Sequence, residues 1–562
     1  MAMNTVHLIA HIMKLVSSQF RPRPLLAALA ALLPVMAAAQ QLPNAGRILQ
    51  EQQQAEPPVP AASPDLNMSS PIPDTVAPGG AKARVDGIEL SGNQVFTQAQ
   101  LLARLGGYQG REYDLAGLQG LANQLTRYYH DAGYPFARVY LPAQSLDKGI
   151  VRMQVLEGRY GRVTAEGDTR AQGYLSGLKP GEVIESAPLE RAALLLSDLP
   201  GVNISPIMRP GQELGTGDLA VDVRRGERVT GSVGLDNQGN RYTGQFRANA
   251  SLAINSPFML GDQIALRAQQ TSENMTFGDV GYSLPLGTSG LRGRVGYGYT
   301  NYELGKEFND LDAHGTAKVA SAGLSYPLLR SQSRNLTLGV DFLHKQLRDE
   351  YRAAELTLDK FTNSVPVSAQ FDVRDSLGGG GVTYGALTWT PGTLKLKGGQ
   401  AEADALTAKS DGRYNKLNLD IARLQSLAPK WTLYGRFSGQ WTDDNLDSSE
   451  DFGLGGPAGV RAYPVGEGYG DRGWLAQVEV RYAVGPVSPF VFYDAGRVQI
   501  NAHPWMAGEN FRRIAGTGVG ARLNLGGWRA EATVAWRTDG GAPQSDSKDR
   551  KPMFWLTAQY AF

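Results

Sequence analysis

Residues 474–482 have the sequence WLAQVEVRY, in which apolar and polar side chains alternate. One face of an extended chain would carry Trp474, Ala476, Val478, Val480 and Tyr482, and the other face would carry Gln477, Glu479 and Arg481. A period of two is typical of a β-strand with one apolar and one polar face, whereas an amphipathic helix repeats every 3.6 residues. This stretch therefore predicts a strand that lies between an apolar and a polar environment.

The same alternation continues on both sides of this strand. From about Thr230 onward, segments of roughly 8–11 residues alternate in this way and are separated by Gly, Asn, Asp and Pro. Examples lie at residues 291–300, 336–342, 431–441, 528–537 and 554–562. The pattern predicts an antiparallel β structure over residues 229–562.

Two kinds of protein have this pattern, a large soluble antiparallel protein and a transmembrane β-barrel. The barrel is favoured because aromatic residues stand at strand ends, where a membrane interface would lie, and because Arg and Glu in mid-strand suit a wide, wet lumen. Residues 229–562, at about 20 residues per strand and connection, give about 16 strands, an even number. We predict a β-barrel membrane protein of about 16 antiparallel strands. Its last strand carries Tyr560 and Phe562, which we expect to act as a C-terminal assembly signal.

The N-terminus indicates export. Lys14, Arg21 and Arg23 precede an apolar stretch at residues 25–36, which is followed by three alanines and a glutamine. A basic region, a short apolar region and an A-x-A site are typical of a secretory signal peptide, which we expect to span residues 1–39. The alternative is a membrane-anchoring helix. It is disfavoured because the apolar run is shorter than the ~20 residues that span a bilayer and is interrupted by proline.

Four zones lie between the expected signal peptide and the expected barrel. They are a helix-forming segment at residues 40–54, a proline-rich linker at 55–81, and two similar α/β modules at 82–158 and 159–228. The linker composition predicts an extended, flexible chain. In the first module, Thr97 with Gln100 predicts a capping box for one helix, and Asp114 predicts the start of a second.

Composition excludes several classes of function. The formal net charge is +1, from 55 Lys+Arg against 54 Asp+Glu, which gives no case for a nucleic-acid partner. There is no cysteine, so a disulfide, a thiolate metal site and a cysteine nucleophile are all excluded. Motifs of serine hydrolases, P-loop proteins and zinc proteases are absent, and we expect neither enzyme activity nor a cofactor nor a metal site. The acidic run at residues 443–451 is expected to be a solvated loop rather than a cation site.

Several strings of residues together carry a resemblance to a known family. They lie at residues 133–144, 155–158, 196–202, 234–244, 256–262 and 282–286. Taken with tandem α/β modules before a barrel, they resemble the BamA superfamily, and within it the TpsB translocators of two-partner secretion. The modules look like POTRA (polypeptide-transport-associated) domains, and residues 40–54 resemble the plug helix that occupies the TpsB pore.

The sharpest string is GVRAYP at residues 459–464, which contains Val460, Arg461, Ala462 and Tyr463. It resembles the VRGY-type loop of the superfamily, which folds back into the barrel lumen, although the family usually has glycine where this chain has Ala462. In the family the loop arginine pairs with acids on the inner wall. The matching wall motif, from Phe492 to Gly496, nominates Asp494.

Glu531 lies on the polar face of a late strand and is expected to be a second partner of Arg461. A bidentate carboxylate would fix both the charge and the direction of the loop. The alternative is a solvated loop arginine without such a partner.

The resemblance implies an outer-membrane translocator of a Gram-negative bacterium, with its POTRA modules in the periplasm. Its implied partners are an unfolded, secreted TpsA-type exoprotein, outer-membrane lipid including lipopolysaccharide, and the barrel-assembly machinery for its own insertion. Small α/β modules have sheet edges that can add an extended strand of cargo. Two alternatives remain at this stage, a BamA-like insertase of other barrels and a passive or gated pore.

Overall fold

The computed structural model of the chain describes residues 42–54, 57–64, 66, 68–145 and 149–562. The expected signal peptide lies outside these residues. The described residues divide into two compact units, one within Ala62–Gly226 together with Arg330–Gln332 and the other formed by the remaining described residues. Among the described residues, no helix has both the length and the apolar character needed to cross a bilayer.

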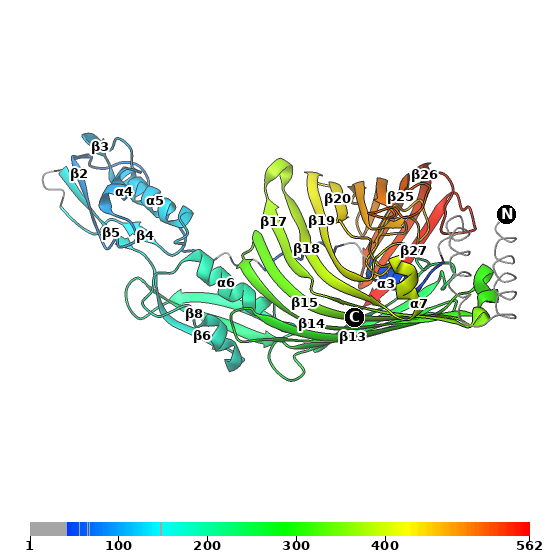
Figure 1. Cartoon of the computed structure of the whole chain (residues 1–562). Coiled ribbons are helices and arrows are strands. Elements are labelled where there is room, and N and C mark those ends of the chain that lie inside the picture. The colour runs from blue at the N-terminus through cyan, green and yellow to red at the C-terminus, as the bar shows by residue number, and fades with distance from the viewer. Residues whose placement is uncertain (1–41, 55–56, 65, 67, 146–148) are drawn as a thin grey trace. The chain divides into compact units, whose positions relative to one another are not determined.

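The larger unit is a closed antiparallel barrel, in which consecutive strands pair and β27 returns to pair with β9 (Figure 1). Its first strands are β9 (Val229–Asp236), β10 (Arg247–Asn255), β11 (Gln263–Thr271), β12 (Thr276–Pro285), β13 (Arg292–Glu303), β14 (Ala313–Arg330) and β15 (Arg334–Tyr351). They are followed by β16 (Leu356–Ser364), β17 (Val367–Asp375), β18 (Gly381–Leu396), β19 (Gly412–Ala428) and β20 (Trp431–Thr442). The last are β23 (Arg472–Tyr482), β24 (Val487–Gln499), β25 (Phe511–Leu525), β26 (Trp528–Asp539) and β27 (Met553–Ala561).

Short helices connect some of these strands. They are η3 (Lys306–Leu311), η4 (Arg352–Ala354), η5 (Leu377–Gly379) and α7 (Gly399–Ala405).

Two of these segments, β16 and β17, form one strand of the wall. Both pair with β15 and with β18, and they are separated only by Val365 and Pro366. Proline has no N–H for the ladder, so the strand is interrupted there. The Pro366 carbonyl still accepts a hydrogen bond from the Asp341 N–H at 3.0 Å. The wall therefore has sixteen strands, and the predicted fold class is confirmed.

Burial along the strands follows the predicted alternation. In β23, Trp474 and Val478 are 39% and 48% exposed and face outward, whereas Gln477 and Glu479 are 1% exposed and face the lumen. At the barrel end where β9 begins, outward aromatic residues pair across strands. Trp431 and Tyr482 have ring centroids 4.7 Å apart, and Trp528 and Tyr560 have centroids 5.2 Å apart. This arrangement is typical of an interfacial girdle.

The joint that closes the barrel is short. β27 pairs with β9 over five residue positions, from Thr557 opposite Asp236 to Ala561 opposite Ser232. The flanking pairs are longer, with eight positions between β9 and β10 and eight between β26 and β27.

The smaller unit contains the two predicted α/β modules. The first consists of β1 (Ala83–Val85), β2 (Gly87–Ser91), α4 (Gln98–Leu102), β3 (Arg111–Tyr113), α5 (Leu115–Asp131), β4 (Arg138–Tyr140) and β5 (Ile150–Leu156). Its main sheet has the order β2-β5-β4, and the small β1–β3 pair was not predicted. The capping box of Thr97 and Gln100 is present at α4. Asp114 caps α5, and hydrogen bonds from the Gly117 and Gly79 N–H groups lower the pKa of its carboxyl group.

The second module consists of β6 (Arg159–Glu166), η2 (Thr169–Leu175), α6 (Ser186–Ser197), β7 (Val202–Pro210) and β8 (Thr216–Arg225). Its sheet has the order β6-β8-β7, with β6 parallel to β8. In this module the sequence pattern predicts a strand near Val163, a helix from Pro188 to about Leu199 and a strand at residues 219–223, which correspond to β6, α6 and β8, but it does not predict β7. Each module thus combines a three-stranded sheet with helices, which confirms two POTRA-like modules.

The string VLEG at residues 155–158 has a structural explanation. The Glu157 carboxylate is buried and accepts hydrogen bonds from the Gln94 and Val95 N–H groups and from the Tyr129 hydroxyl. Gly158 has φ +71°, and a Cβ there would lie 2.7 Å from the Phe136 carbonyl oxygen. Glu157 therefore holds the loop between β2 and α4 against the end of β5. The close approach of Phe136 leaves no room for a side chain at position 158.

Candidate functional site

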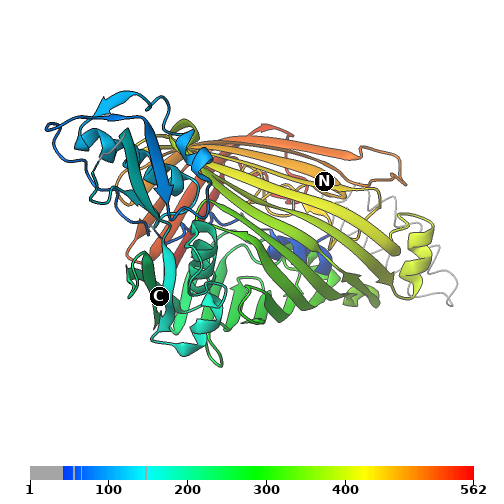
Figure 2. The same cartoon turned by 90° about the vertical axis from the view of Figure 1, so that its left-hand side faces the viewer.

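A helix lies inside the barrel. This helix, α3 (Ala45–Gln53), is separate from every wall strand and is surrounded by them in both views (Figure 1, Figure 2). Asn44 caps it by accepting a hydrogen bond from the Arg47 N–H at 3.0 Å. Its Ile48 and Leu49 are 0% and 4% exposed. They pack on a cluster that includes Tyr302 and Leu347 of the wall strands β13 and β15, and Tyr242, Leu304 and Phe308 of the connections between strands.

Polar contacts complete the docking of α3. The Ala45 N–H donates to Asp349 Oδ1 at 2.8 Å, and Asn240 Nδ2 donates to Glu51 Oε1 at 2.9 Å. Gly46 lies directly against the long loop between β20 and β23, since a Cβ there would be 2.8 Å from the Ser449 nitrogen. The Ser448 hydroxyl donates to Asn44 Oδ1 at 2.9 Å. The helix therefore contacts both the wall and this loop.

The loop between β20 and β23, residues 443–471, contains the small pair β21 (Phe452–Gly453) and β22 (Tyr469–Gly470). Its acidic run was expected to be a solvated loop, and that expectation was wrong for most of its length. Asp447 pairs with Lys360 at 2.5 Å, and Glu450 pairs with Lys345 at 2.7 Å and with Lys416 at 2.8 Å. These lysines come from wall strands far apart in the sequence, so alternation alone did not predict the pairing.

Glu450 is the centre of this lysine cluster. Its side chain is only 3% exposed. Burial raises the pKa of Glu450, but Lys345 and Lys416 oppose this and together lower it to about 2. Glu450 is therefore ionised at neutral pH and holds two strands and the loop together. Asp443, at the start of the same run, is 100% exposed and contacts only the surface residue Arg472 among the described ion pairs.

Arg461 lies at the centre of the second half of the loop and is 2% exposed. Its guanidinium binds Asp494 in a bidentate manner, with Nε to Oδ2 at 2.8 Å and Nη2 to Oδ1 at 2.7 Å. The backbone N–H of Arg461 also donates to Asp494, at 3.1 Å. The guanidinium carbon lies 3.6 Å from the ring centroid of Phe492, two residues before Asp494 on β24. The expected pairing with Asp494 is thus present in the structure, and the alternative of a solvated arginine is not observed.

The second acid on Arg461 is Glu479 and not Glu531. Nη1 of Arg461 binds Glu479 Oε1, whereas Glu531 binds Arg522 at 2.7 Å. Arg522 in turn binds Glu479 at 2.8 Å, so Glu531 reaches Arg461 only through two intermediates. The physical reason is register. Glu479 lies on β23, next to the strand that carries Asp494, while Glu531 lies on β26, two strands away on the other side.

Small residues make room for the loop on the wall. A Cβ at Gly496 would lie 2.6 Å from Leu454 of the loop, and a Cβ at Gly516 would lie 2.3 Å from the Ala462 methyl group. Ala462 is absent from the described non-glycine residues with positive φ, so this turn does not need the glycine that the family usually has. The extra methyl group of Ala462 is accommodated by the missing side chain of Gly516.

Further contacts that the sequence did not reveal hold the rest of the loop. The Tyr463 hydroxyl lies within hydrogen-bond distance of the carbonyl oxygens of Asp539 and Gly541, at 2.6 and 2.9 Å, and shares its one hydrogen between them. Trp555 Nε1 donates to the Arg461 carbonyl at 2.7 Å, and Val460 is fully buried. The loop and α3 therefore fill the lumen together. Within the described residues no group of three or more His, Asp and Glu is arranged to hold a metal ion. In the lumen, Glu450 binds lysine and Asp494 binds arginine.

Comparisons with known proteins assign this architecture to a family. The profile described as haemolysin secretion/activation protein ShlB/FhaC/HecB matches residues 215–523, more than half of the chain. The chain belongs to the ShlB/FhaC/HecB family. The profile of the ShlB-type POTRA domain matches residues 83–158, in the first α/β module.

Relatives within the ShlB/FhaC/HecB family are similar over most of their length. The heme/hemopexin transporter protein HuxB of Haemophilus influenzae (strain 86-028NP) is 28% identical over 485 residues, which cover 83% of this chain and 84% of HuxB. The outer membrane transporter CdiB of Dickeya dadantii is 26% identical over 397 residues, which cover 69% of this chain and 70% of that protein. The solved structure of CdiB from Escherichia coli has the same fold, with a TM-score of 0.68 at 19% identity, covering 97% of this chain and all of CdiB.

Family and fold together establish what the chain does. It is an outer-membrane translocator of two-partner secretion, with its POTRA modules in the periplasm, and its partner is a secreted exoprotein. The barrel end at which β9 begins directly follows the POTRA modules in the chain and is therefore the periplasmic end. The loop at residues 443–471 starts and finishes at the opposite end, which faces the cell surface.

Proposed function

We propose that this translocator binds its unfolded exoprotein on the edges of the POTRA sheets and passes it through the lumen after α3 has left. The observation that carries the proposal is that α3 fills the lumen without belonging to the wall. Its hydrogen bonds to the wall and the loop are made by side chains or by its capped end, and the linker at residues 55–81 gives it a tether. Withdrawal of α3 would break no pairing between wall strands.

The POTRA sheets offer a place for an extended cargo. In the sheet order β2-β5-β4, the strands β2 and β4 are edges, and β6 and β7 are the edges of the second sheet. An edge strand has unpaired N–H and C=O groups that can add a strand of another chain, with little demand on its sequence. This mode suits a long, unfolded exoprotein, and it requires no catalytic step by this chain.

Two further roles complete the proposal. Asp494 and Glu479 anchor the loop through Arg461, so that the loop keeps a fixed direction in the lumen, while Glu531 supports Glu479 through Arg522. Tyr560 and Phe562, which are 37% and 53% exposed on the outer wall, present an aromatic strand that the barrel-assembly machinery would engage during insertion.

The test is a reversible lock on α3. Asn44 and Ser448 are in direct side-chain contact, and the chain has no native cysteine, so in the double variant Asn44→Cys with Ser448→Cys a disulfide within the chain can join only these two positions. We expect the oxidised double variant to stop export of its exoprotein partner when it is expressed in a deletion strain, and a reductant to restore export. Each single variant should export in both conditions, because neither can close the lock.

The outcomes separate the rival functions. Export that continues with the lock closed would refute withdrawal of α3. Unchanged secretion of the exoprotein in the uncomplemented deletion strain would refute the translocator assignment itself. General loss of other outer-membrane barrels in that strain would favour an insertase, and loss of solute uptake alone would favour a pore.

A further inference from the structure

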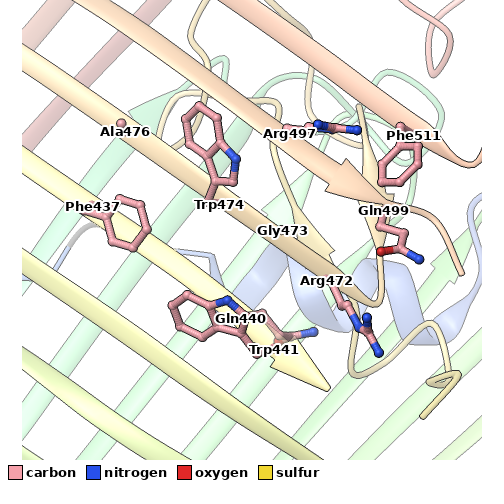
Figure 3. Close-up of a pocket in the computed structure, with 10 residues that line it drawn as sticks. All are labelled: Phe437, Gln440, Trp441, Arg472, Gly473, Trp474, Ala476, Arg497, Gln499 and Phe511. Atoms are coloured by element: carbon pink, nitrogen blue, oxygen red, sulfur yellow. The ribbon is translucent and has the colours of Figure 1, made fainter. Parts of the chain in front are cut away.

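The outer wall has a hollow near the cell-surface end of the barrel. It has a volume of about 550 Å³ and lies across β20, β23, β24 and β25. Three of its lining residues, Trp441, Trp474 and Phe511, are 45%, 39% and 47% exposed and are large aromatics. Figure 3 shows the Arg497 side chain between those of Trp474 and Phe511. The guanidinium carbon of Arg497 is 4.2 Å from the Phe511 ring centroid.

Arg497, which lines the hollow, stands opposite a second arginine, Arg513, which does not line it. Arg497 of β24 is the direct register partner of Arg513 of β25, and both point outward by the alternation of their strands. Like charges directly opposite on adjacent strands are destabilising. Arg513 has one surface partner, Asp539, at 3.0 Å, and its side chain is still 73% exposed. Among the described residues, Arg497 makes no ion pair, and its only recorded side-chain contact is the Phe511 ring.

The arginines that face the lumen on the same strands behave differently. Arg436 of β20 pairs with Asp420 at 2.7 Å, and Arg481 of β23 pairs with Glu479 at 2.7 Å. Arg522, on the same strand as Arg513, pairs with Glu479 at 2.8 Å. An exposed, unpaired arginine on the lipid side is therefore an exception within this part of the wall. It indicates that its counter-charge comes from outside the chain.

The depth of the hollow limits what that counter-charge can be. Arg497 lies one outward position inside the end of β24, among aromatic residues of the kind that mark a membrane interface. A charge at this level meets the headgroups of the outer leaflet and not the hydrocarbon centre. The aromatic rings and Ala476 beside it offer an apolar floor, which acyl chains would cover.

We propose that Arg497 and Arg513, with Trp474 and Phe511, form a binding site on the outer wall for the phosphorylated glucosamine headgroup of lipopolysaccharide. A phosphate between the two guanidinium groups would cancel their repulsion, and guanidinium forks bind phosphate through paired hydrogen bonds. The acyl chains would follow the hollow along β23 toward Ala476. The site requires only that the barrel lies in the outer membrane, so it does not depend on how export proceeds.

Binding of purified lipid A to the full-length protein in detergent tests this site, with native mass spectrometry or thermal stabilisation as the measurement. We expect the wild-type protein to bind bisphosphorylated lipid A about tenfold more tightly than the dephosphorylated lipid. A difference of this size in the dissociation constant is what the loss of one charged hydrogen bond typically causes. Arg497→Gln and Arg513→Gln should each remove most of this preference. Lys430→Gln is the matched control, because it removes one exposed cation from the β19–β20 turn at the periplasmic end.

Several results would overturn the proposal. Equal binding of the two lipids by the wild-type protein would do so, and this comparison needs no variant to fold. The proposal would also be wrong if both glutamine variants kept the preference for the phosphorylated lipid, or if phosphatidylglycerol bound as tightly as lipid A. It would likewise be wrong if inorganic phosphate stabilised the protein as much as lipid A does at equal phosphate concentration. Arg497→Lys keeps the charge and is expected to give intermediate affinity, which checks that the glutamine variants act through charge rather than misfolding.

Discussion

Gly516 and Ala462 act as a pair at the point where the loop meets the wall. The absent side chain of one residue makes space for the methyl group of the other, since a Cβ at Gly516 would lie 2.3 Å from the Ala462 Cβ. The contact fixes the position of Arg461, which is the neighbour of Ala462 in the chain. A substitution at either residue should therefore alter the geometry of the Arg461–Asp494 ion pair.

We predict that Gly516→Ala weakens the folded barrel by about 1–3 kcal/mol, the usual effect of overpacking. Adding Ala462→Gly should recover most of this loss, because it removes the methyl group that the new side chain meets. The measurement is the temperature at which the folded band disappears in a heat-modifiability gel, for both single variants and the double variant. If the two changes are simply additive, the residues do not interact as described.

At the level of single residues, the sequence was sufficient to predict a site residue where that residue lies within a recognisable motif. The string from Phe492 to Gly496 pointed to Asp494, and the structure places it on Arg461. Glu479 was missed although it lies in the first strand recognised, because alternation gives the face of a residue but not its neighbour across the sheet. Glu531 satisfied the same alternation, and only the strand order distinguishes the two acids.

At the level of elements, the loop at residues 443–471 is held by buried ion pairs whose partners lie on the wall, and α3 in turn contacts this loop. The side chains of Lys345, Lys416 and Glu450 are 4%, 10% and 3% exposed. Removing one member of such a cluster leaves the others buried and uncompensated, which typically costs about 3–5 kcal/mol.

Glu450→Gln should therefore loosen the loop and with it the seat of α3. We expect frequent openings in planar-bilayer recordings, where the wild-type protein is mostly closed. Asp443→Asn is the matched control from the same acidic run, because its exposed ion pair is worth only about 0–1 kcal/mol. Similar recordings from both variants would mean that the lysine cluster does not hold the loop.

The elements themselves were predictable to different degrees. The capping box at Thr97 and the cap at Asp114 gave the two helices of the first module directly, because local hydrogen bonds determine helix starts. The small β1–β3 pair was missed because each strand has only three residues and the two strands are far apart in the sequence. The strand β7 was missed because Pro206 and Pro210 interrupt its apolar residues, and proline argues against a strand. The acidic run was predicted as solvated because its lysine partners lie on three separate strands.

At the level of the whole molecule, the barrel wall is complete without its contents. Deletion of residues 42–54 should leave the wall folded, since its hydrogen bonds run between strands, and should raise single-channel conductance several-fold. The side chains in and near the space that this deletion opens carry both positive and negative charge. They are Lys345, Lys360, Lys416, Asp349, Asp447 and Glu450. We therefore expect weak selectivity between cations and anions. An unchanged conductance would show that the loop alone seals the lumen.

The short joint between β27 and β9 has a mechanical consequence. A chain that pushes outward from the lumen puts the wall under hoop tension, and this tension passes through every strand pair in series. The β27–β9 pair has five ladder positions against eight at its neighbours, with one more reciprocal backbone pair between Gly231 and Phe562, and we expect it to yield first. The width of cargo that the cylinder tolerates is thus limited by one weak seam and not by the average strength of the sheet.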